Sequence, residues 1–279
     1  MNLELFRSLW TCRFDLAAAL EDVRSGLFNG VEGPVPGDAA ARRTFATRLQ
    51  DAGSPFIAEV VTGGGYVPNA AATAAKQREE FERKAEAALE CRPRFLTAMT
   101  GSDRWPIGES VEFFGKVLEI ARRLEIEVCI ETHRTRPTFH PWATAALVNA
   151  LPALRLTCDF SHWCCVCERL VLEEEPELLA LFAGRAGHVH ARVGYDQGAQ
   201  DPHPAAPENR AALQAHERWW RAIWQARKGV KTITMTPEFG PDGYLQTLPF
   251  TGLPVADLDE INRWMAARLR EQFAAFLLL

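Results

Sequence analysis

Short apolar runs alternate with longer amphipathic stretches along the whole chain. Each apolar run has the length of a strand, and in each amphipathic stretch the apolar residues recur with the period of an α-helix. Strands that alternate with helices are typical of a parallel sheet, because parallel neighbours need a crossover connection. The expected strands cover residues 6–12, 30–34, 56–62, 95–99, 126–131, 156–159, 186–191 and 230–238. The expected helices cover residues 15–23, 39–52, 69–89, 111–124, 141–151, 168–182, 208–226 and 257–276.

Eight strand–helix units, spaced by roughly 25 to 40 residues, account for the chain without a second domain. A barrel of eight such units commonly contains about 250 residues, and this chain has 279. Its hydrophobic content of 47% allows a sizeable core. We therefore expect residues 1–279 to form one α/β domain, a (β/α)8 TIM barrel.

Charge and cysteine content exclude several classes of protein. The formal net charge is −5, and no dense run of Lys and Arg interrupts it, which disfavours nucleic acid as a partner. No apolar run is long enough to span a membrane, and the first residues lack the pattern of a signal peptide. Cys164 and Cys167 form one Cys-x-x-Cys spacing, without the second pair that a structural zinc site needs. We expect a cytoplasmic protein with reduced thiols.

Four consecutive expected strands end in a residue that can bind a metal. Glu131, Asp159, His190 and Glu238 each follow an apolar run. One acidic residue at a strand end is commonly a capping or loop-facing group, but four in a row suggest a shared site. The carboxyl ends of parallel strands meet at one mouth of a barrel, and three carboxylates with an imidazole suit a divalent ion.

The expected seventh strand carries two histidines that face the same side, His188 and His190. His190 lies nearer the mouth, where the other three candidate ligands end. We therefore expect His188 to lie one layer deeper and to hydrogen-bond a carboxylate. The reverse assignment, in which the two histidines exchange roles, stays open at this point.

Four motifs resemble those of the xylose isomerase-like TIM barrels, the superfamily of sugar phosphate isomerases/epimerases and apurinic endonuclease 2. They are Glu131-Thr132-His133-Arg134, Asp159-Phe160-Ser161-His162-Trp163, His188-Val189-His190-Ala191-Arg192 and Pro237-Glu238-Phe239-Gly240. The resemblance covers nearly the whole chain. It implies that the four strand-end residues bind one divalent metal and that Glu131 and Glu238 form the acid/base pair.

The same resemblance implies that His162 contacts substrate, as the matching histidine does in the related ketose 3-epimerases. Those epimerases have an arginine six residues beyond the ligand histidine, whereas this chain has Asp196 there and an arginine at Arg192. Specificity for free ketohexoses is therefore not implied. The other candidates for substrate contact are His133, Arg134, Arg192, Trp163 and His188.

The arginines and tryptophans among these residues have two readings each. Arg134 and Arg192 can bind a phosphate or carboxylate of the substrate, or can pair with a loop carboxylate. Trp10, Trp105 and Trp163 can line a sugar face or can belong to the core.

The mostly hard ligand set favours Mn²⁺, with Mg²⁺, Co²⁺ or Zn²⁺ as alternatives. We expect a metal-dependent isomerase or epimerase of carbohydrate metabolism that acts on a sugar or sugar-derived substrate. It would transfer a proton at a chelated hydroxy-carbonyl through an enediolate. A hydride shift usually relies on a second metal. Near the ends of these strands, only Glu32 and Glu59 remain as further acidic groups that could bind one. We interpret these two as ion-paired inside the barrel.

Three alternatives stay open to different degrees. A dehydratase of the inosose or dehydroshikimate type would use the same four ligands. An apurinic endonuclease needs histidines after the third and fourth strands, and residues 59–62 and 98–101 contain none. A non-catalytic binding barrel would have no reason to gather carboxylates at one mouth.

The proline-containing loop 194–207 is expected to be a lid or a subunit contact, and the apolar residues 273–279 suggest a homodimer.

Overall fold

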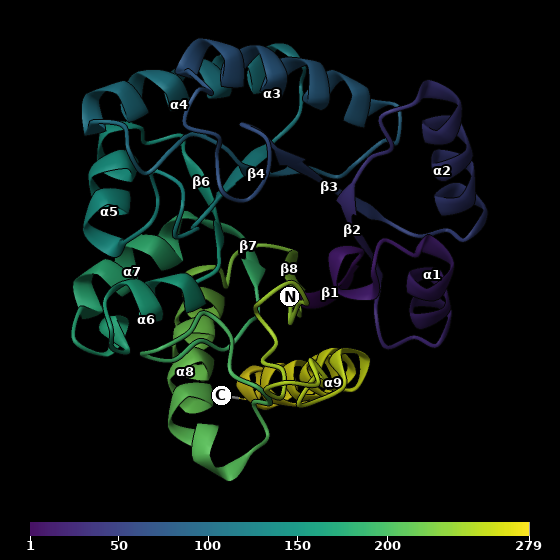
Figure 1. The fold of residues 1–279 in the computed structure, drawn as a ribbon, viewed down its shortest axis with the longest axis vertical. Helices are drawn as coiled ribbons and strands as arrows, with labels where there is room; N and C mark the ends of the chain where they lie inside the picture. Colours follow the sequence, from purple (N-terminus) through teal and green to yellow (C-terminus); the bar gives the residue numbers. More distant parts are fainter. Residues whose placement is uncertain (279) are drawn as a thin grey trace.

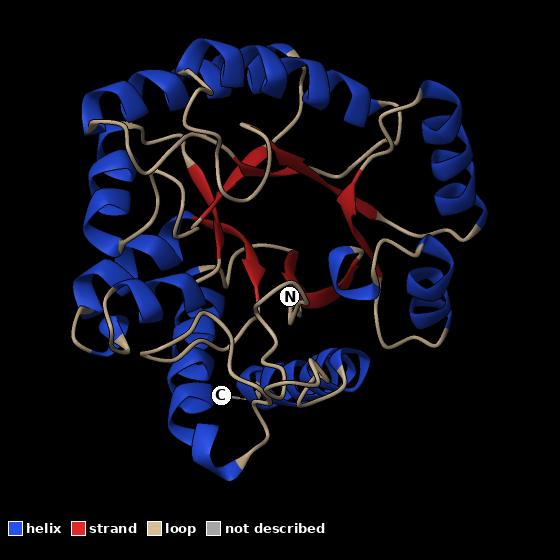
Figure 2. Cartoon of the chain, in the orientation of Figure 1, coloured by secondary structure: helices blue, strands red, loops and turns tan. Residues whose placement is uncertain are grey.

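The computed structural model describes residues 1–278. Eight parallel strands pair in the order of the sequence, and β1 pairs with β8 to close the barrel. Figures 1 and 2 show the strands as an inner ring with the helices around it. The strands are β1 (Asn2–Ser8), β2 (Gly30–Pro34), β3 (Phe56–Val61), β4 (Leu96–Met99), β5 (Val128–Glu131), β6 (Arg155–Cys158), β7 (Ala186–His190) and β8 (Thr232–Thr236). The predicted (β/α)8 architecture is confirmed.

Helices outside the barrel follow the predicted pattern, and most begin at a side chain that caps them. The α-helices are α1 (Leu16–Arg24), α2 (Ala39–Asp51), α3 (Ala74–Leu89), α4 (Ile107–Arg123), α5 (Pro141–Ala150), α6 (Ser161–Val166), α7 (Pro176–Arg185), α8 (Arg210–Ala226) and α9 (Leu258–Leu277). The Asp15 side chain accepts hydrogen bonds from the first amides of α1, and Asp257 does so for α9. The third predicted helix begins five residues late, because Thr73 caps it. No helix in residues 1–278 is long and apolar enough to cross a membrane.

Two further predicted elements differ in extent from the structure. The first strand ends at Ser8, and Trp10–Cys12 form a 3-10 helix, η1, before a turn with positive φ at Arg13 and Phe14. The helix predicted over 168–182 is two elements, the 3-10 helix η2 (Val171–Glu173) and α7. Pro176 cannot lie inside a helix but fits its first turn, so α7 begins there.

The barrel interior is filled in layers, as expected for this fold. The lowest layer is apolar and consists of Phe6, Ile57, Phe95 and Cys129. Above it, hydroxyl groups pair, as in the 2.7 Å contact between Thr97 Oγ1 and Thr157 Oγ1. Charged groups occupy the top. The main apolar core lies between the strands and the helices, so the interior mouth is left for polar chemistry.

The C-terminal helix contributes to this outer core. Phe273 and Phe276 are buried, with ring centroids 5.1 and 5.6 Å from that of Trp224 on α8. Burying each of these phenylalanines contributes roughly 1.5–3 kcal/mol. Leu277 and Leu278 are exposed, and Leu279 lies outside the described residues. Much of the apolar C-terminus is thus explained by core packing, and the homodimer stays a prediction that rests on the two exposed leucines.

Loop 194–207 has no helix, as predicted, and it is anchored at the mouth. The short 3-10 helix η3 (Pro207–Asn209) follows at its end. The Gln200 side chain donates to the carbonyl of Gly240 at 3.2 Å and accepts from its amide at 2.8 Å. Ala199, Gln200 and Asp201 are buried. These contacts tie the loop after β7 to the loop after β8, so the two loops are expected to move together.

Candidate active site

The four strand-end residues predicted as metal ligands converge at the carboxyl end of the barrel. One ligand atom from each of Glu131, Asp159, His190 and Glu238 lies within 4.8 Å of the others, and all four residues are buried. Glu131 ends β5 and His190 ends β7, while Asp159 and Glu238 follow β6 and β8. Adjacent parallel strands that end at the same mouth of the barrel therefore bring the four side chains together. We refer to them below as the quartet.

His190 lies between two sets of carboxylates. Its Nδ1 is 3.0 Å from Glu238 Oε2 and 3.7 Å from Glu131 Oε1, and its Nε2 is 3.0 Å from Glu32 Oε1. Burial alone would lower the pKa of His190, but the carboxylates of Glu238 and Glu32 raise it well above its ordinary value. Within the described chain, the buried Nδ1 has no partner with hydrogen-bond geometry. Glu32 thus orients the ring so that Nδ1 faces the quartet.

The layer below the quartet contains His188 and Glu32. His188 Nε2 is 3.1 Å from Glu32 Oε2, and its Nδ1 is 2.8 Å from Thr234 Oγ1. Although burial opposes it, the two histidines lower the pKa of Glu32 well below its ordinary value. The deeper position predicted for His188 and the ion-paired interpretation of Glu32 are therefore confirmed. The expectation that His188 contacts substrate is wrong, because its side chain is fully buried beneath the quartet.

The donor set of the quartet fits a divalent ion. Burial raises the pKa of both Glu131 and Asp159, and the charge of Glu238 adds to this in each case. A bound cation would relieve this repulsion and would satisfy the free Nδ1 of His190. Glu131 also groups with His133 and His162. A metal ion between the His133 and His162 rings is disfavoured, because the positively charged Arg192 already contacts His162, with its Nη2 2.8 Å from His162 Nε2.

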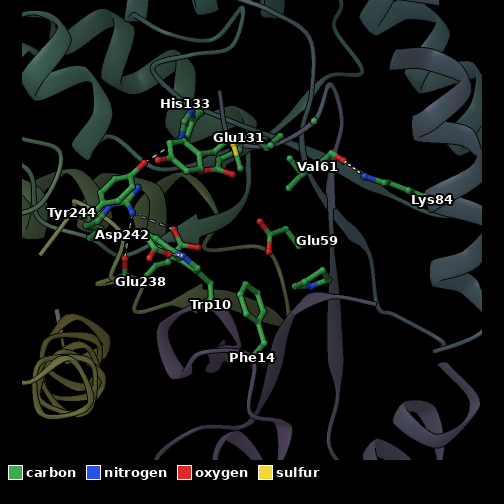
Figure 3. Close-up of a pocket in the computed structure, with 16 residues that line it drawn as sticks. Trp10, Phe14, Glu59, Val61, Lys84, Glu131, His133, Glu238, Asp242 and Tyr244 are labelled. Atoms are coloured by element: carbon green, nitrogen blue, oxygen red, sulfur yellow. Dashed lines mark hydrogen bonds and ion pairs between the residues drawn. The ribbon is translucent and has the colours of Figure 1, made fainter. Parts of the chain in front are cut away.

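A pocket of about 360 Å³ opens above the quartet, and Figure 3 shows its lining residues. Of the quartet, Glu131 and Glu238 line this pocket, while Asp159 and His190 lie beneath them. Four aromatic side chains contribute to its walls, those of Trp10, Phe14, Tyr66 and Tyr244. The Trp10 and Tyr244 rings meet edge to face with centroids 5.2 Å apart. The pocket thus combines the carboxyl groups of Glu131 and Glu238 with flat apolar surfaces of the kind that pack on a sugar face.

Arg192 holds one member of the quartet in place. Its guanidinium forms a short ion pair with Asp159, and its Nε donates to Ser161 Oγ at 3.1 Å. Ser161 in turn donates to Asp159 at 2.5 Å. Arg192 lines the pocket and lies 4.5 Å from the centroid of the Tyr244 ring. Of the two interpretations of this arginine, the structure shows pairing with a carboxylate, and the partner is the quartet residue Asp159.

His133 and His162 form a close pair beside the quartet, with ring centroids 4.0 Å apart and the ring planes tilted by 54°. His133 lines the pocket, and its Nε2 is 3.3 Å from the Tyr244 hydroxyl. His162 is fully buried behind Arg192. Burial lowers the pKa of both imidazoles well below the ordinary value; Arg192 adds to this for His133, and the neighbouring His133 does so for His162. Both rings are therefore neutral, and His133 is the one placed to meet a ligand directly.

Three other predicted residues lie away from this pocket. Arg134 borders a neighbouring hollow of about 300 Å³ on the far side of Tyr244, with its guanidinium 4.7 Å from the ring centroid. Trp163 is fully buried, stacks on Phe160 and donates to the carbonyl of Thr138, so its predicted substrate contact is wrong. Trp105 packs on Phe113 in the core. The local direction of a side chain on the short helix α6 cannot be read from sequence.

Trp10, in contrast, is a pocket wall, and its place depends on Gly240. A Cβ at Gly240 would lie 2.0 Å from Cη2 of the Trp10 ring. Trp10 Nε1 also donates to Asp242 at 3.2 Å. The motif Pro237-Glu238-Phe239-Gly240 thus contributes a glycine as well as a carboxylate to the site.

Sequence reasoning missed three features of the site. The ion-paired interpretation of Glu59 is wrong, because Glu59 lines the pocket and makes no ion pair or hydrogen bond with residues 1–278. Because side chains alternate between the two faces of a strand, the sequence of β3 already indicates that Glu59 points into the barrel. Tyr244 lies in an irregular loop, where no periodicity reveals direction. Arg136 is fully buried and donates to the carbonyls of Thr62 at 3.0 Å, Gly101 at 2.9 Å and Gly65, which ties the loops after β3 and β4 together.

The barrel and its quartet define a TIM barrel with a potential metal centre at the carboxyl end of the strands. Residues 16–219 match the xylose isomerase-like TIM barrel family, and the chain belongs to that family. No curated protein matches the chain by sequence.

Three solved structures of similar fold are at most 14% identical in sequence. An L-ribulose 3-epimerase has a TM-score of 0.68 at 14% identity, with 99% of this chain and 96% of that chain covered. The probable 3-DHS dehydratase AsbF from Bacillus anthracis has a TM-score of 0.61 at 14% identity, with 97% and 99% covered. The IOLI protein, which contains a zinc atom, has a TM-score of 0.63 at 14% identity, with 99% and 98% covered. At this identity the likeness concerns the fold.

Proposed function

We propose that this protein is a divalent-metal-dependent isomerase or epimerase that moves a proton on a sugar or sugar-derived substrate. The observation that carries the proposal is that only two members of the quartet also reach the pocket. All four side chains converge, yet only Glu131 and Glu238 also line the pocket. Two carboxylates that border one pocket can serve two positions or two faces of a bound molecule.

The metal would be held by the carboxylates of Glu131, Asp159 and Glu238 and by Nδ1 of His190. We propose Mn²⁺, because three carboxylates and one imidazole form a mostly oxygen donor set, although the similar IOLI structure contains zinc. When bound, such an ion supplies Lewis acidity, which polarises a carbonyl and makes the neighbouring C–H more acidic.

The side chains around the quartet would divide the remaining tasks. Glu131 and Glu238 take up and return the proton, since each reaches the pocket. Glu32 fixes the ring of His190, and Arg192 with Ser161 fixes the carboxylate of Asp159. Neutral His133 can exchange a hydrogen bond with a substrate hydroxyl. Trp10 and Tyr244 exclude water from the reacting face.

A solvent-exchange experiment tests the reaction class. The Mn²⁺-loaded protein is incubated in D₂O with a panel of sugars, sugar phosphates, sugar acids and inososes, and products are analysed by NMR. Turnover should place deuterium at the carbon beside the carbonyl, and Glu131→Gln and Glu238→Gln should each stop the exchange. Glu119→Gln, an exposed change on α4, serves as the control. Product without deuterium at that carbon would contradict proton transfer, and loss of water from the product would assign the protein to the dehydratases.

DNA cleavage is not proposed, because the ends of β3 and β4 carry hydroxyl groups where an apurinic endonuclease needs histidines. Thr62 and Thr100 occupy these positions and share a 2.6 Å hydrogen bond. The net charge of −5 also gives no general attraction for a phosphate backbone.

A further inference from the structure

Glu59 faces the pocket from the side of β3. Along this strand, Ile57 belongs to the apolar layer inside the barrel, while Ala58 and Val60 pack against the helices. Alternation therefore turns Glu59 inward, and Figure 3 shows its carboxyl group in the pocket, apart from Glu131 and Glu238. Its nearest companions on the pocket wall along β2 and β3 are Pro34 and Val61.

The carboxyl group of Glu59 is the exception among the acidic groups at this mouth. Glu32, Asp159 and Glu238 each have a histidine or arginine partner. Glu59 forms no ion pair or hydrogen bond with any residue from 1 to 278, and it belongs to none of the groups whose ligand atoms lie within 4.8 Å of one another. It is therefore not positioned as a metal ligand, and the pocket separates it from the quartet.

The cations near the pocket are already engaged. Arg192 pairs with Asp159, and Lys84 donates to the carbonyl of Val61 at 2.6 Å and pairs with Glu80 at 2.7 Å. Arg134 borders the other hollow. Burial raises the pKa of Glu59 to about 8, and the charges of Glu238 and Glu131 add to this. Arg192 and Lys84 both line the pocket, and each is thus already paired with a carboxylate.

We propose that Glu59 determines substrate specificity by accepting a hydrogen bond from a hydroxyl group of an uncharged polyhydroxy substrate, and by excluding substrates that carry a phosphate or carboxylate at that end. The proposal rests on the proposed function, since the other end of the substrate would lie at the quartet. A hydroxyl group can donate to an oxygen of the ionised Glu59 carboxylate, whereas a fully ionised phosphate has no proton to donate and is repelled by that carboxylate. The aromatic walls suit the carbon faces of such a molecule.

Binding of ribitol and ribitol 5-phosphate tests the proposal, because neither has a carbonyl and neither can turn over. Isothermal titration at pH 8.5, where most of Glu59 is ionised, measures both dissociation constants for the wild type, Glu59→Gln, Glu59→Asp and the surface control Glu119→Gln, with and without Mn²⁺. The wild type should bind ribitol at least about tenfold more tightly than its phosphate, the effect of one hydrogen bond to a charged group. Glu59→Gln should lose most of that preference, Glu59→Asp should keep part of it, and the control should keep all of it.

Mn²⁺ affinity is measured in the same variants and should be unchanged by Glu59→Gln. Equal or tighter binding of the phosphate by the wild type, the same preference in Glu59→Gln, or no detectable ribitol binding would each overturn the proposal. A loss of Mn²⁺ affinity in Glu59→Gln would also overturn it, since Glu59 would then be a ligand. Failure of the wild type to bind Mn²⁺ would instead count against the proposed function, while the metal-free titrations would still decide the role of Glu59.

Discussion

Asp201 should destabilise the protein at neutral pH, and Asp201→Asn should relieve the effect. The residue lies in loop 194–207 with 0% exposure, and within the described chain neither carboxyl oxygen has a hydrogen-bond partner. Burial raises its pKa to about 8 from an ordinary value of 3.8. The folded protein therefore binds the proton more tightly than the unfolded chain, so stability falls as pH rises from about 4 to about 8 and is constant above that.

The size of the effect follows from the interval between the two pKa values. Between the ordinary pKa of 3.8 and pH 7, about three pH units, the unfolded chain ionises and the folded protein does not. This difference lowers the free energy of unfolding at pH 7 by roughly 4 kcal/mol. Water that reaches the carboxylate when the loop relaxes will reduce this value, so we expect about 2–4 kcal/mol. Asparagine has nearly the same shape and no charge, so Asp201→Asn removes this term without opening a cavity.

Urea unfolding followed by circular dichroism at pH 4, 6 and 8, in the presence of EDTA, measures the difference. Asp201→Asn should exceed the wild type in free energy of unfolding by about 2–4 kcal/mol at pH 8 and by little at pH 4. Asp196→Asn, an exposed change in the same loop, is the control and should have no effect. A variant that is no more stable than the wild type at pH 8 would refute the reasoning, because the carboxylate would then have an ionic partner.

Three further predictions concern other parts of the structure. Gly240→Ala should displace Trp10, shifting the tryptophan fluorescence spectrum and lowering stability by about 1–3 kcal/mol, whereas an unshifted spectrum would contradict the close approach. Arg136→Met should cost at least about 3 kcal/mol in urea unfolding, because buried carbonyls lose their donors; a loss below about 1 kcal/mol would mean that water replaces them. Replacing Leu277 and Leu278 together by Glu should convert a dimer to a monomer in sedimentation velocity, and an unchanged sedimentation coefficient would argue against that interface.

The fold and the quartet could be predicted from sequence because barrel geometry leaves little freedom. Each strand end reaches the same mouth, so an acidic residue or histidine there is placed by the strand count alone. Glu131 and His190 end their strands in the structure as they do in the sequence pattern. The order of His188 and His190 followed from the direction of one strand.

What sequence could not give was the choice of partner and the course of the loops. Arg192 pairs with Asp159, a contact that depends on packing between two loops. Trp163 lies in the core on α6, which begins at Ser161, and so short a helix shows no periodicity in its sequence. Tyr244 reaches the pocket from a turn with positive φ at Asp242 and Gly243. The sequence allows Glu59 to be placed inside the barrel. Its lack of an ion-pair partner depends on where the side chains from all the other strand ends lie, which the sequence does not show.

The account depends most directly on the quartet binding one metal ion. Isothermal titration of the EDTA-treated and dialysed protein with Mn²⁺ should show one ion per chain, and Asp159→Asn should abolish this binding while the circular dichroism spectrum is retained. Asp196→Asn, which removes an exposed carboxylate outside the quartet, should bind Mn²⁺ as the wild type does. Unchanged affinity and stoichiometry in a folded Asp159→Asn protein would contradict the assignment of Glu131, Asp159, His190 and Glu238 as the metal site.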